Sequence, residues 1–514
     1  MRLARGLAAG ATLLAAAGCA QRASLPRFDL EGWKELRDGR VEIVGDASEA
    51  DLRRLADDLA LFVAVAGAIT NARTAAERLP TRILLLDNAA VRQLRLTGLG
   101  GFMAPLLDGY LAMVRLEGGR VSPATRQVLF HEYTHFLLHN GAAVAYPRWY
   151  HEGFAELLST VRRREDLIEV GLPPQDRAVA FARQRGFDLA TVFAPESYAD
   201  IDDPGRFYAG AWATVHYLNA SEARGEQLER FLALLVSGVG WSDAYPQAFD
   251  EPLAELSREV LAHGRALAGG APFAILALDA RRLEIASRPE VRALAPAEAA
   301  AALGEFWLRL AIAGDPDEED EALAFARGFF ERSLALGPEG ARTRAGLALC
   351  LALQGALDSA AANAARALAV APDDAQVQAL AGEVDAARAR SLADDGDADG
   401  AAAARLASRA AFVRATALAP EDPVAWAGLG ASWLGSDGDL APGIAALERA
   451  RELGAWSAPP TLALAQLYLA SGQRGLARVR LEEVVRRGEG ASAEAAEELL
   501  AGLDAEAPPG AAAR

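Results

Sequence analysis

Cysteine is almost absent from this chain of 514 residues, which contains only Cys19 and Cys350. At most one disulfide could form within it, so packing rather than cross-linking must stabilise the fold. Lysine is rarer still, because Lys34 is the only lysine among 52 lysine and arginine residues. The formal net charge of −18 argues against nucleic acid as a partner and against a polybasic membrane patch.

The N-terminal apolar run is too short to span a membrane as a helix. It extends from Gly6 to Ala17 and is preceded by Arg2 and Arg5. Basic residues followed by a short apolar segment are typical of a secretory signal peptide. We therefore expect residues 1–18 to direct export.

The sequence Ala-Ala-Gly-Cys at 16–19 resembles the bacterial lipobox, whose cysteine becomes the acylated first residue of a lipoprotein. The resemblance implies lipidation of Cys19, a tether over residues 19–27 and a location in the bacterial cell envelope, anchored to a membrane on its periplasmic or extracytoplasmic side. Several acyl chains on one cysteine anchor a protein firmly. Ala16 stands where leucine is commonest, so ordinary signal-peptidase cleavage is the alternative.

Histidine is also scarce, with six in the chain, yet residues 131–135 read His-Glu-Tyr-Thr-His. On a helix, His131 and His135 lie one turn apart on the same face, so both imidazoles can bind one ion. Glu132 lies beside them, where its carboxylate can take a proton from an activated water. Glu152, in a second polar motif, is the candidate third ligand.

Helix-end signals flank the first motif. Ser122 followed by Pro123 is typical of an N-cap and a first helical residue. Asn140-Gly141 is a C-terminal stop signal. The sequence therefore predicts one helix that carries both histidines.

The second motif, Trp-Tyr-His-Glu-Gly-Phe-Ala-Glu at 149–156, follows Pro147 and is predicted to lie on another helix. Glu156 would lie one turn beyond Glu152, where it can accept a hydrogen bond from the outer N–H of a ligating histidine. Gly153 would let the two motif helices approach closely.

Together the two motifs resemble those of the gluzincin metallopeptidases, most closely the peptidase MA-like group related to thermolysin and the M1 aminopeptidases. The resemblance implies one Zn²⁺ per chain, bound by His131, His135 and Glu152, with Glu132 as the catalytic base. It also implies a protein or peptide substrate. The alternative is a degenerate protease fold in which the motif survives as a buried polar cluster.

Residues 207–218 resemble the helix of M1-type enzymes that carries a transition-state tyrosine. By that likeness, Tyr208 would donate its phenol proton to the oxyanion formed on the attacked carbonyl. The alternative is a tyrosine on an ordinary amphipathic helix. His216 is a weaker candidate for assisting the oxyanion, and His263 is expected on the surface.

Strands are expected at 41–44, 81–86 and 109–116, from their short apolar segments and glycine-rich flanks. The last of these lies just before the metal-binding helix. In gluzincins such a strand borders the cleft and an extended substrate can add to its open edge; the alternative is a strand of plain core sheet. We assign residues 28–268 to the peptidase domain, a small mixed sheet plus helices. Residues 269–300 are expected to form a helical connector.

Beyond residue 300 the sequence becomes rich in alanine and leucine and acquires a period. Leu-Gly-Pro at 336–338 recurs as Val-Ala-Pro at 370–372, and Ala-Pro at 419–420 follows an insertion. Residues 426–433 then match the first helix of a tetratricopeptide (TPR) repeat. This resembles a TPR array over residues 301–504, which would bind a protein partner on its concave face; a generic helical bundle is the alternative.

The tail, residues 505–514, is expected to be disordered. The sequence thus predicts an α+β chain: a gluzincin-type peptidase domain followed by an all-α TPR-like solenoid. We expect a secreted, lipid-anchored zinc peptidase whose repeats recruit a substrate or partner. A non-catalytic TPR scaffold and a zinc hydrolase acting on cell-wall material are the alternatives.

Overall fold

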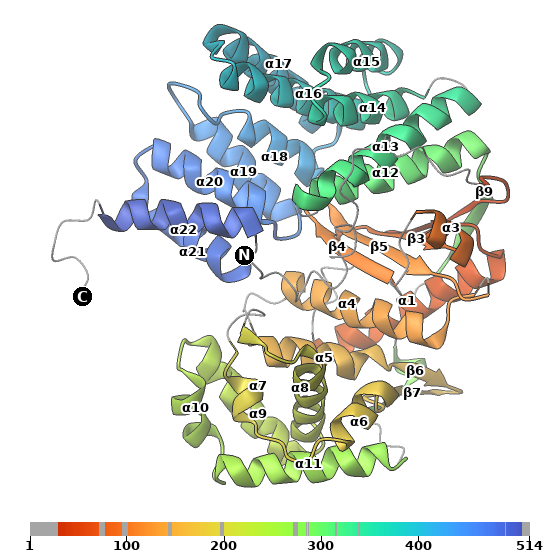
Figure 1. The fold of residues 1–514 in the computed structure, drawn as a ribbon, viewed down its shortest axis with the longest axis vertical. Helices are drawn as coiled ribbons and strands as arrows, with labels where there is room; N and C mark the ends of the chain where they lie inside the picture. Colours follow the sequence, from red (N-terminus) through yellow and green to blue (C-terminus); the bar gives the residue numbers. More distant parts are fainter. Residues whose placement is uncertain are drawn as a thin grey trace.

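The computed structural model describes residues 29–505, except for 71–77, 95–100, 119, 142–145, 196–199, 271–275, 284, 286, 314–315, 338–339 and 489. A sheet with its helices is followed by an all-α array (Figure 1). The prediction of an α+β chain with an all-α C-terminal part is confirmed at this level.

The helices that precede the array surround two sheets. α1 and α4 lie against the larger sheet, whereas α5 to α11 form a separate helical layer below it (Figure 1). These helices are α1 (Glu49–Thr70), α3 (Asn88–Gln93), α4 (Pro123–Gly141), α5 (Arg148–Ser159), α6 (Gln175–Ala182), α7 (Ala190–Phe193), α8 (Pro204–Leu218), α9 (Glu222–Val236), α10 (Trp241–Ala248) and α11 (Leu253–Ala268).

Within the described residues, six strands form the larger sheet in the order β4-β5-β3-β2-β1-β9. The inner strands β5, β3 and β2 run parallel, and the pairs at both edges are antiparallel. A smaller antiparallel sheet has the order β6-β7-β8. The strands are β1 (Lys34–Asp38), β2 (Val41–Gly45), β3 (Thr81–Leu86), β4 (Gly101–Leu106), β5 (Gly109–Arg115), β6 (Arg162–Arg164), β7 (Leu167–Val170), β8 (Leu276–Asp279) and β9 (Glu290–Ala293).

Both faces of the larger sheet are buried, which explains the unbroken apolar sequence of β3. Ile83 and Leu85 belong to the core formed with α1 and α4. Leu84 and Leu86 belong to a second core formed with the first helices of the array. Alternate residues of a strand point to opposite faces, so one sheet joins the helix of the first motif to the array.

The three predicted strands are present as β2, β3 and β5, but two expectations about this region are wrong. β5 is paired on both sides, and among the described strands it is β4 that forms this edge of the sheet. Residues 269–300 do not form a helical connector: β8 adds to the small sheet and β9 pairs with β1. Arg292 Nε of β9 lies 2.5 Å from Glu35 Oε2 of β1. Pairing with a distant strand, rather than local sequence, decides this conformation.

The array consists of helical hairpins, and the predicted repeat boundaries coincide with helix ends. Leu336, Val370 and Leu418 are the last residues of α13, α15 and α17. The array helices are α12 (Pro296–Ala313), α13 (Pro316–Leu336), α14 (Ala341–Leu353), α15 (Leu357–Val370), α16 (Ala375–Asp394), α17 (Ala398–Leu418), α18 (Pro423–Ala431), α19 (Ala441–Leu453), α20 (Ala458–Ala470), α21 (Arg474–Arg487) and α22 (Gly490–Ala505).

Glycines opposite phenylalanines fix the spacing of these hairpins. Phe412 of α17 packs against Gly382 of α16 and Gly428 of α18, and neither glycine has room for a Cβ. Phe330 of α13 contacts Gly346 of α14 in the same way. Small residues at such positions allow the close stacking that buries a repeat's apolar face.

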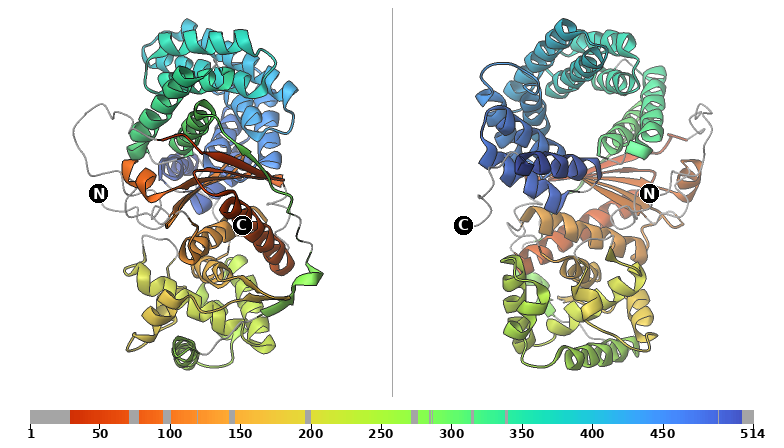
Figure 2. Two further views of the ribbon diagram at one scale, coloured as in Figure 1. Left: turned by 90° about the vertical axis from the view of Figure 1, so that its right-hand side faces the viewer. Right: turned by 60° about the vertical axis from the view of Figure 1, so that its left-hand side comes forward.

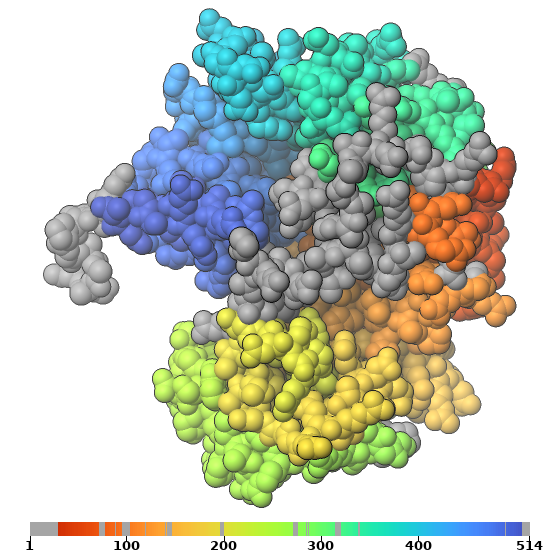
Figure 3. All heavy atoms as spheres, in the orientation of Figure 1, coloured from red at the N-terminus to blue at the C-terminus, as the bar shows by residue number. Residues whose placement is uncertain are grey.

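The far end of the array returns to the N-terminal part of the chain, so that the helices curve over the larger sheet (Figure 2). The turn between α19 and α20 makes the contact. Ala455 N donates to Leu107 O in the β4–β5 turn (2.8 Å), and Trp456 N donates to Asn140 Oδ1 of α4 (3.0 Å). In the space-filling view the array forms the upper lobe and α5 to α11 the lower lobe (Figure 3).

Among the helices of the described residues, none combines the length and apolar character that crossing a membrane requires.

Candidate metal centre

Helix α4 carries the first motif, and its ends follow the cap signals of the sequence. Ser122 Oγ accepts a hydrogen bond from the backbone N–H of Thr125 (3.1 Å). Pro123 is the first helical residue, and the helix ends at Gly141. The predicted bounds of this helix are therefore confirmed.

The side chains of His131, His135 and Glu152 meet between α4 and α5. His131 Nε2 lies 3.3 Å from His135 Nε2 and 3.2 Å from Glu152 Oε2. His135 Nε2 lies 3.4 Å from the same carboxylate oxygen. Within the described residues, this is the one group of three His, Cys, Asp or Glu side chains whose ligand atoms all lie within 4.8 Å of one another.

These separations fit the geometry of a tetrahedral ion. Nitrogen and oxygen ligands bound to zinc at about 2.0–2.2 Å lie roughly 3.3 Å from one another. The three distances between ligand atoms are 3.2, 3.3 and 3.4 Å. Two imidazoles and one carboxylate are also a donor set that suits zinc and leaves a fourth position for water or substrate.

The electrostatics of the group favour a bound cation. Burial alone would lower the pKa of His131, but its hydrogen bond with Glu152 and the charge of Glu156 raise that pKa to about 9. Burial would raise the pKa of Glu152, but His135 and the hydrogen bonds from both histidines hold it well below its ordinary value. A buried carboxylate that stays ionised here stabilises positive charge at the centre.

Glu156 lies next to the ligands, but its hydrogen bond goes elsewhere. His131 Nδ1 lies 3.7 Å from Glu156 Oε1, which is too long for a direct hydrogen bond. The same oxygen accepts a hydrogen bond from Arg177 Nε of α6 at 2.6 Å. No motif pointed to Arg177, because only the packing of α6 against α8 brings it here.

Gly153 of the second motif packs against a different helix from the one predicted. Gly153 faces Ala211 and Val215 of α8, and their atoms leave no room for a Cβ. The close approach is therefore between α5 and α8, not between the two motif helices. It draws the helix with Tyr208 toward the helix with Glu152.

Glu132 and Tyr208 lie close enough to interact electrostatically, and both are half-buried. Burial raises the pKa of the Tyr208 phenol well above its ordinary value, and the charges of Glu152 and Glu132 raise it further. The Arg177 guanidinium carbon lies 5.3 Å from the centre of the Tyr208 ring. The phenol thus keeps its proton over the physiological pH range and can act as a hydrogen-bond donor.

His151 contacts a ligand of the metal centre, whereas His216 and His263 contact each other. His151 stacks on His135, with ring centroids 5.9 Å apart. His216 is fully buried, its Nδ1 2.9 Å from His263 Nε2 and its Nε2 2.9 Å from Gly171 O. Both ring nitrogens of His216 therefore make these contacts, so His216 does not assist an oxyanion as predicted. His263 is half-buried rather than on the surface. The His139 side chain lies outside the described part, as does Cys19.

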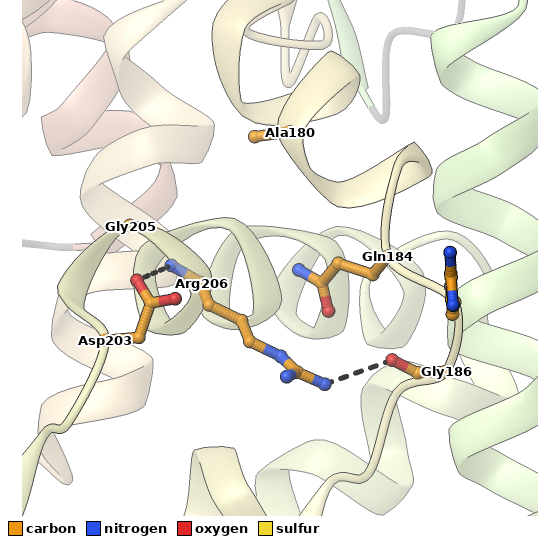
Figure 4. Close-up of a pocket in the computed structure, with 7 residues that line it drawn as sticks. Ala180, Gln184, Gly186, Asp203, Gly205 and Arg206 are labelled. Atoms are coloured by element: carbon orange, nitrogen blue, oxygen red, sulfur yellow. Dashed lines mark hydrogen bonds between the residues drawn. The ribbon is translucent and has the colours of Figure 1, made fainter.

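A pocket of about 460 Å³ lies at the end of α6 and the start of α8 (Figure 4). Its lining includes Gln184, Asp203 and Arg206. Asp203 caps α8 by accepting from Arg206 N (3.1 Å), and the Arg206 side chain donates to Gly186 O (3.2 Å). None of the residues of the metal centre lines it.

No protein-family model matches the chain, and no curated protein sequence matches it. Among solved structures, TTC0263, titled a thermophilic TPR protein of Thermus thermophilus, is 19% identical, with a TM-score of 0.32 over 39% of this chain and 99% of its own. MamA is 18% identical, with a TM-score of 0.25 over 37% and 96%. Yeast Tom70 is 14% identical, with a TM-score of 0.23 over 64% and 69%.

Proposed function

We propose that this chain is a zinc-dependent peptidase of the gluzincin type. The convergence of His131, His135 and Glu152 supports the proposal most strongly, because their ligand atoms are spaced for a tetrahedral ion. Glu132 interacts electrostatically with His131, and Tyr208 with Glu152, so a proton acceptor and a hydrogen-bond donor that hydrolysis of an amide can use accompany this group.

In this mechanism His131, His135 and Glu152 hold zinc, which supplies Lewis acidity when bound. Glu132 accepts a proton from the attacking water and later delivers it to the departing amine. Tyr208 donates a hydrogen bond to the carbonyl oxygen as negative charge develops there. Arg177 fixes Glu156 beside His131 and keeps positive charge near the Tyr208 ring.

A Glu132→Gln variant tests the reaction. It should bind zinc and fold like the wild type but cleave peptides several orders of magnitude more slowly, because it lacks the proton acceptor. Glu165→Gln, at an exposed turn, is the matched control. Equal cleavage by wild type and Glu132→Gln would overturn the mechanism, and release of peptidoglycan fragments instead of peptides would indicate a cell-wall hydrolase.

The helical array supports a second role that does not depend on catalysis: binding of a protein partner or substrate on its concave face. If the metal centre is inactive, this role remains as a scaffold function. Zinc content near zero together with retained partner binding would favour it over a peptidase.

We further propose export and anchoring of the chain in a bacterial cell envelope through lipidated Cys19. The support is the basic and apolar N-terminal sequence that ends in Ala-Ala-Gly-Cys. Replacement of Cys19 by alanine should release the protein from membranes. Unchanged membrane association of that variant would contradict the anchor.

A further inference from the structure

Helix α6 carries neither sequence motif, yet it supplies a side chain to the candidate site. Its Phe181 is fully buried and packs against Gly264 of α11, where there is no room for a Cβ. Arg177 lies four residues before Phe181, and residues four apart share one face of a helix. The packing of Phe181 therefore sets the place of Arg177, from which it reaches side chains of α5 and α8.

Arg177 contacts two sides of the candidate site. On one side its Nε donates to Glu156 Oε1 at 2.6 Å, and this oxygen lies 3.7 Å from Nδ1 of the proposed ligand His131. On the other side its guanidinium carbon lies 5.3 Å from the centre of the Tyr208 ring, a distance typical of a cation–π contact. One side chain thus links the ligand side of the site to the proposed oxyanion donor.

The two contacts depend on the shape of the guanidinium group. It is planar, always charged and has N–H groups in fixed directions, so it can donate to a carboxylate while it lies against an aromatic ring. A lysine ammonium is a single point charge on a flexible stem. The Glu156 side chain is 4% exposed and that of Arg177 is 36% exposed, so the arginine extends from a buried carboxylate toward solvent.

We propose that Arg177 is a positioning residue that holds the Tyr208 ring in one place relative to Glu156 and the metal ligands. The inference rests on the proposed peptidase function and adds to it a residue outside both motifs. Arg177 acts through Tyr208: a phenol that can change its rotamer spends less time where it donates a hydrogen bond to the developing oxyanion. Loss of Arg177 should therefore lower kcat and leave KM nearly unchanged.

Arg177→Gln tests this role, because the glutamine amide can still donate to Glu156 but places no charge against the ring. With a fluorogenic peptide and excess zinc, kcat should fall by about 10–100-fold, as loss of an outer partner of a metal site commonly does. Arg177→Lys should recover part of the lost kcat. Arg183→Gln, at an exposed position at the C-terminal end of the same helix, is the matched control and should behave like the wild type.

Tyr208→Phe, which keeps the ring but lacks the hydroxyl, shows whether Arg177 acts through the phenol. If it does, adding Arg177→Gln to Tyr208→Phe should leave kcat within about twofold of Tyr208→Phe alone. The same fractional loss of kcat in both backgrounds would overturn the inference, because Arg177 would then act independently of Tyr208. A normal kcat of Arg177→Gln in excess zinc would also overturn it, since Arg177 would then serve only the metal ligands.

Thermal unfolding tests the contact apart from catalysis. Arg177→Gln should lower the Tm of the wild type more than the Tm of Tyr208→Leu, which has no ring for the guanidinium group to contact. If the wild type cleaves none of a set of fluorogenic peptides but this difference in Tm is found, the peptidase proposal fails and the positioning of Tyr208 by Arg177 stands. Equal Tm shifts in the two backgrounds would overturn the positioning itself.

Discussion

Gly153 of α5 lies directly against the backbone of Ala211 of α8, with no space for a Cβ between them. The contact links two parts of the candidate site. Glu152 precedes Gly153 in the chain, and Tyr208 lies one turn before Ala211 on α8. Because Gly153 has no Cβ, α5, which carries Glu152, can lie close to α8, which carries Tyr208.

Gly153→Ala should therefore force α5 and α8 apart. We expect a loss of roughly 1–3 kcal/mol in unfolding free energy, typical of overpacking in a close-packed interior, together with weaker zinc binding. Thermal denaturation and metal analysis measure the two effects. Gly225→Ala in α9, where nothing lies within 4 Å of the added Cβ, should keep or slightly raise stability. Equal behaviour of the two variants would contradict the proposed close contact.

Removal of the phenol at Tyr208 should affect turnover without affecting the metal. Tyr208→Phe deletes a hydrogen-bond donor aimed at the developing charge, so kcat should fall by about 10²–10³ while zinc content stays the same. Tyr146→Phe serves as a control, since the Tyr146 ring packs against the Tyr150 ring in a tilted arrangement (centroids 5.1 Å apart). A normal kcat in Tyr208→Phe would contradict a catalytic role for Tyr208 and would favour the alternative, a tyrosine on an ordinary amphipathic helix.

The metal-free protein should lose stability as pH rises through the alkaline range. The pKa of His131 is raised from 6.5 to about 9, so the folded state holds this proton more tightly than the unfolded state. Its stabilising contribution is complete below about pH 6.5 and is lost as pH rises through about 9, amounting to roughly 2–4 kcal/mol. Thermal melts in the presence of a chelator should show this decline.

His131→Gln provides the comparison for that pH dependence. The variant lacks the titrating imidazole, so its metal-free stability should change less between pH 6.5 and about 9. The same slope in both proteins would show that the raised pKa of His131 does not govern the effect.

Phe412 should be the most sensitive single position tested within the array. Phe412→Ala opens a cavity between α16, α17 and α18, where the side chain is 1% exposed, and should cost about 3–5 kcal/mol. The neighbouring Val413 is 51% exposed, so Val413→Ala should change stability by less than about 0.5 kcal/mol. Denaturant titration of the two variants measures the difference; similar midpoints would mean that the hairpins do not stack around Phe412.

Much of the candidate site was predictable because it depends on local spacing. A helical period brings His131 and His135 to one face whatever surrounds them, and Ser122 with Gly141 marks the ends of their helix. Arg177 was not predictable, because its hydrogen bond to Glu156 depends on how α6 packs. The same holds for the pairing of His216 with His263.

The fold, like the site, has features that follow from local sequence and features that depend on tertiary contacts. The sequence alone determined the helix with the two histidines, the strands at 41–44, 81–86 and 109–116, and the repeat boundaries at Leu336, Val370 and Ala419, because periodicity and caps act within a few residues. Tertiary structure alone decided that β4, not β5, forms this edge of the sheet among the described strands, that residues 290–293 join the sheet, and that the array returns to α4. Those features arise from contacts between segments far apart in sequence, where burial and backbone pairing outweigh local preference.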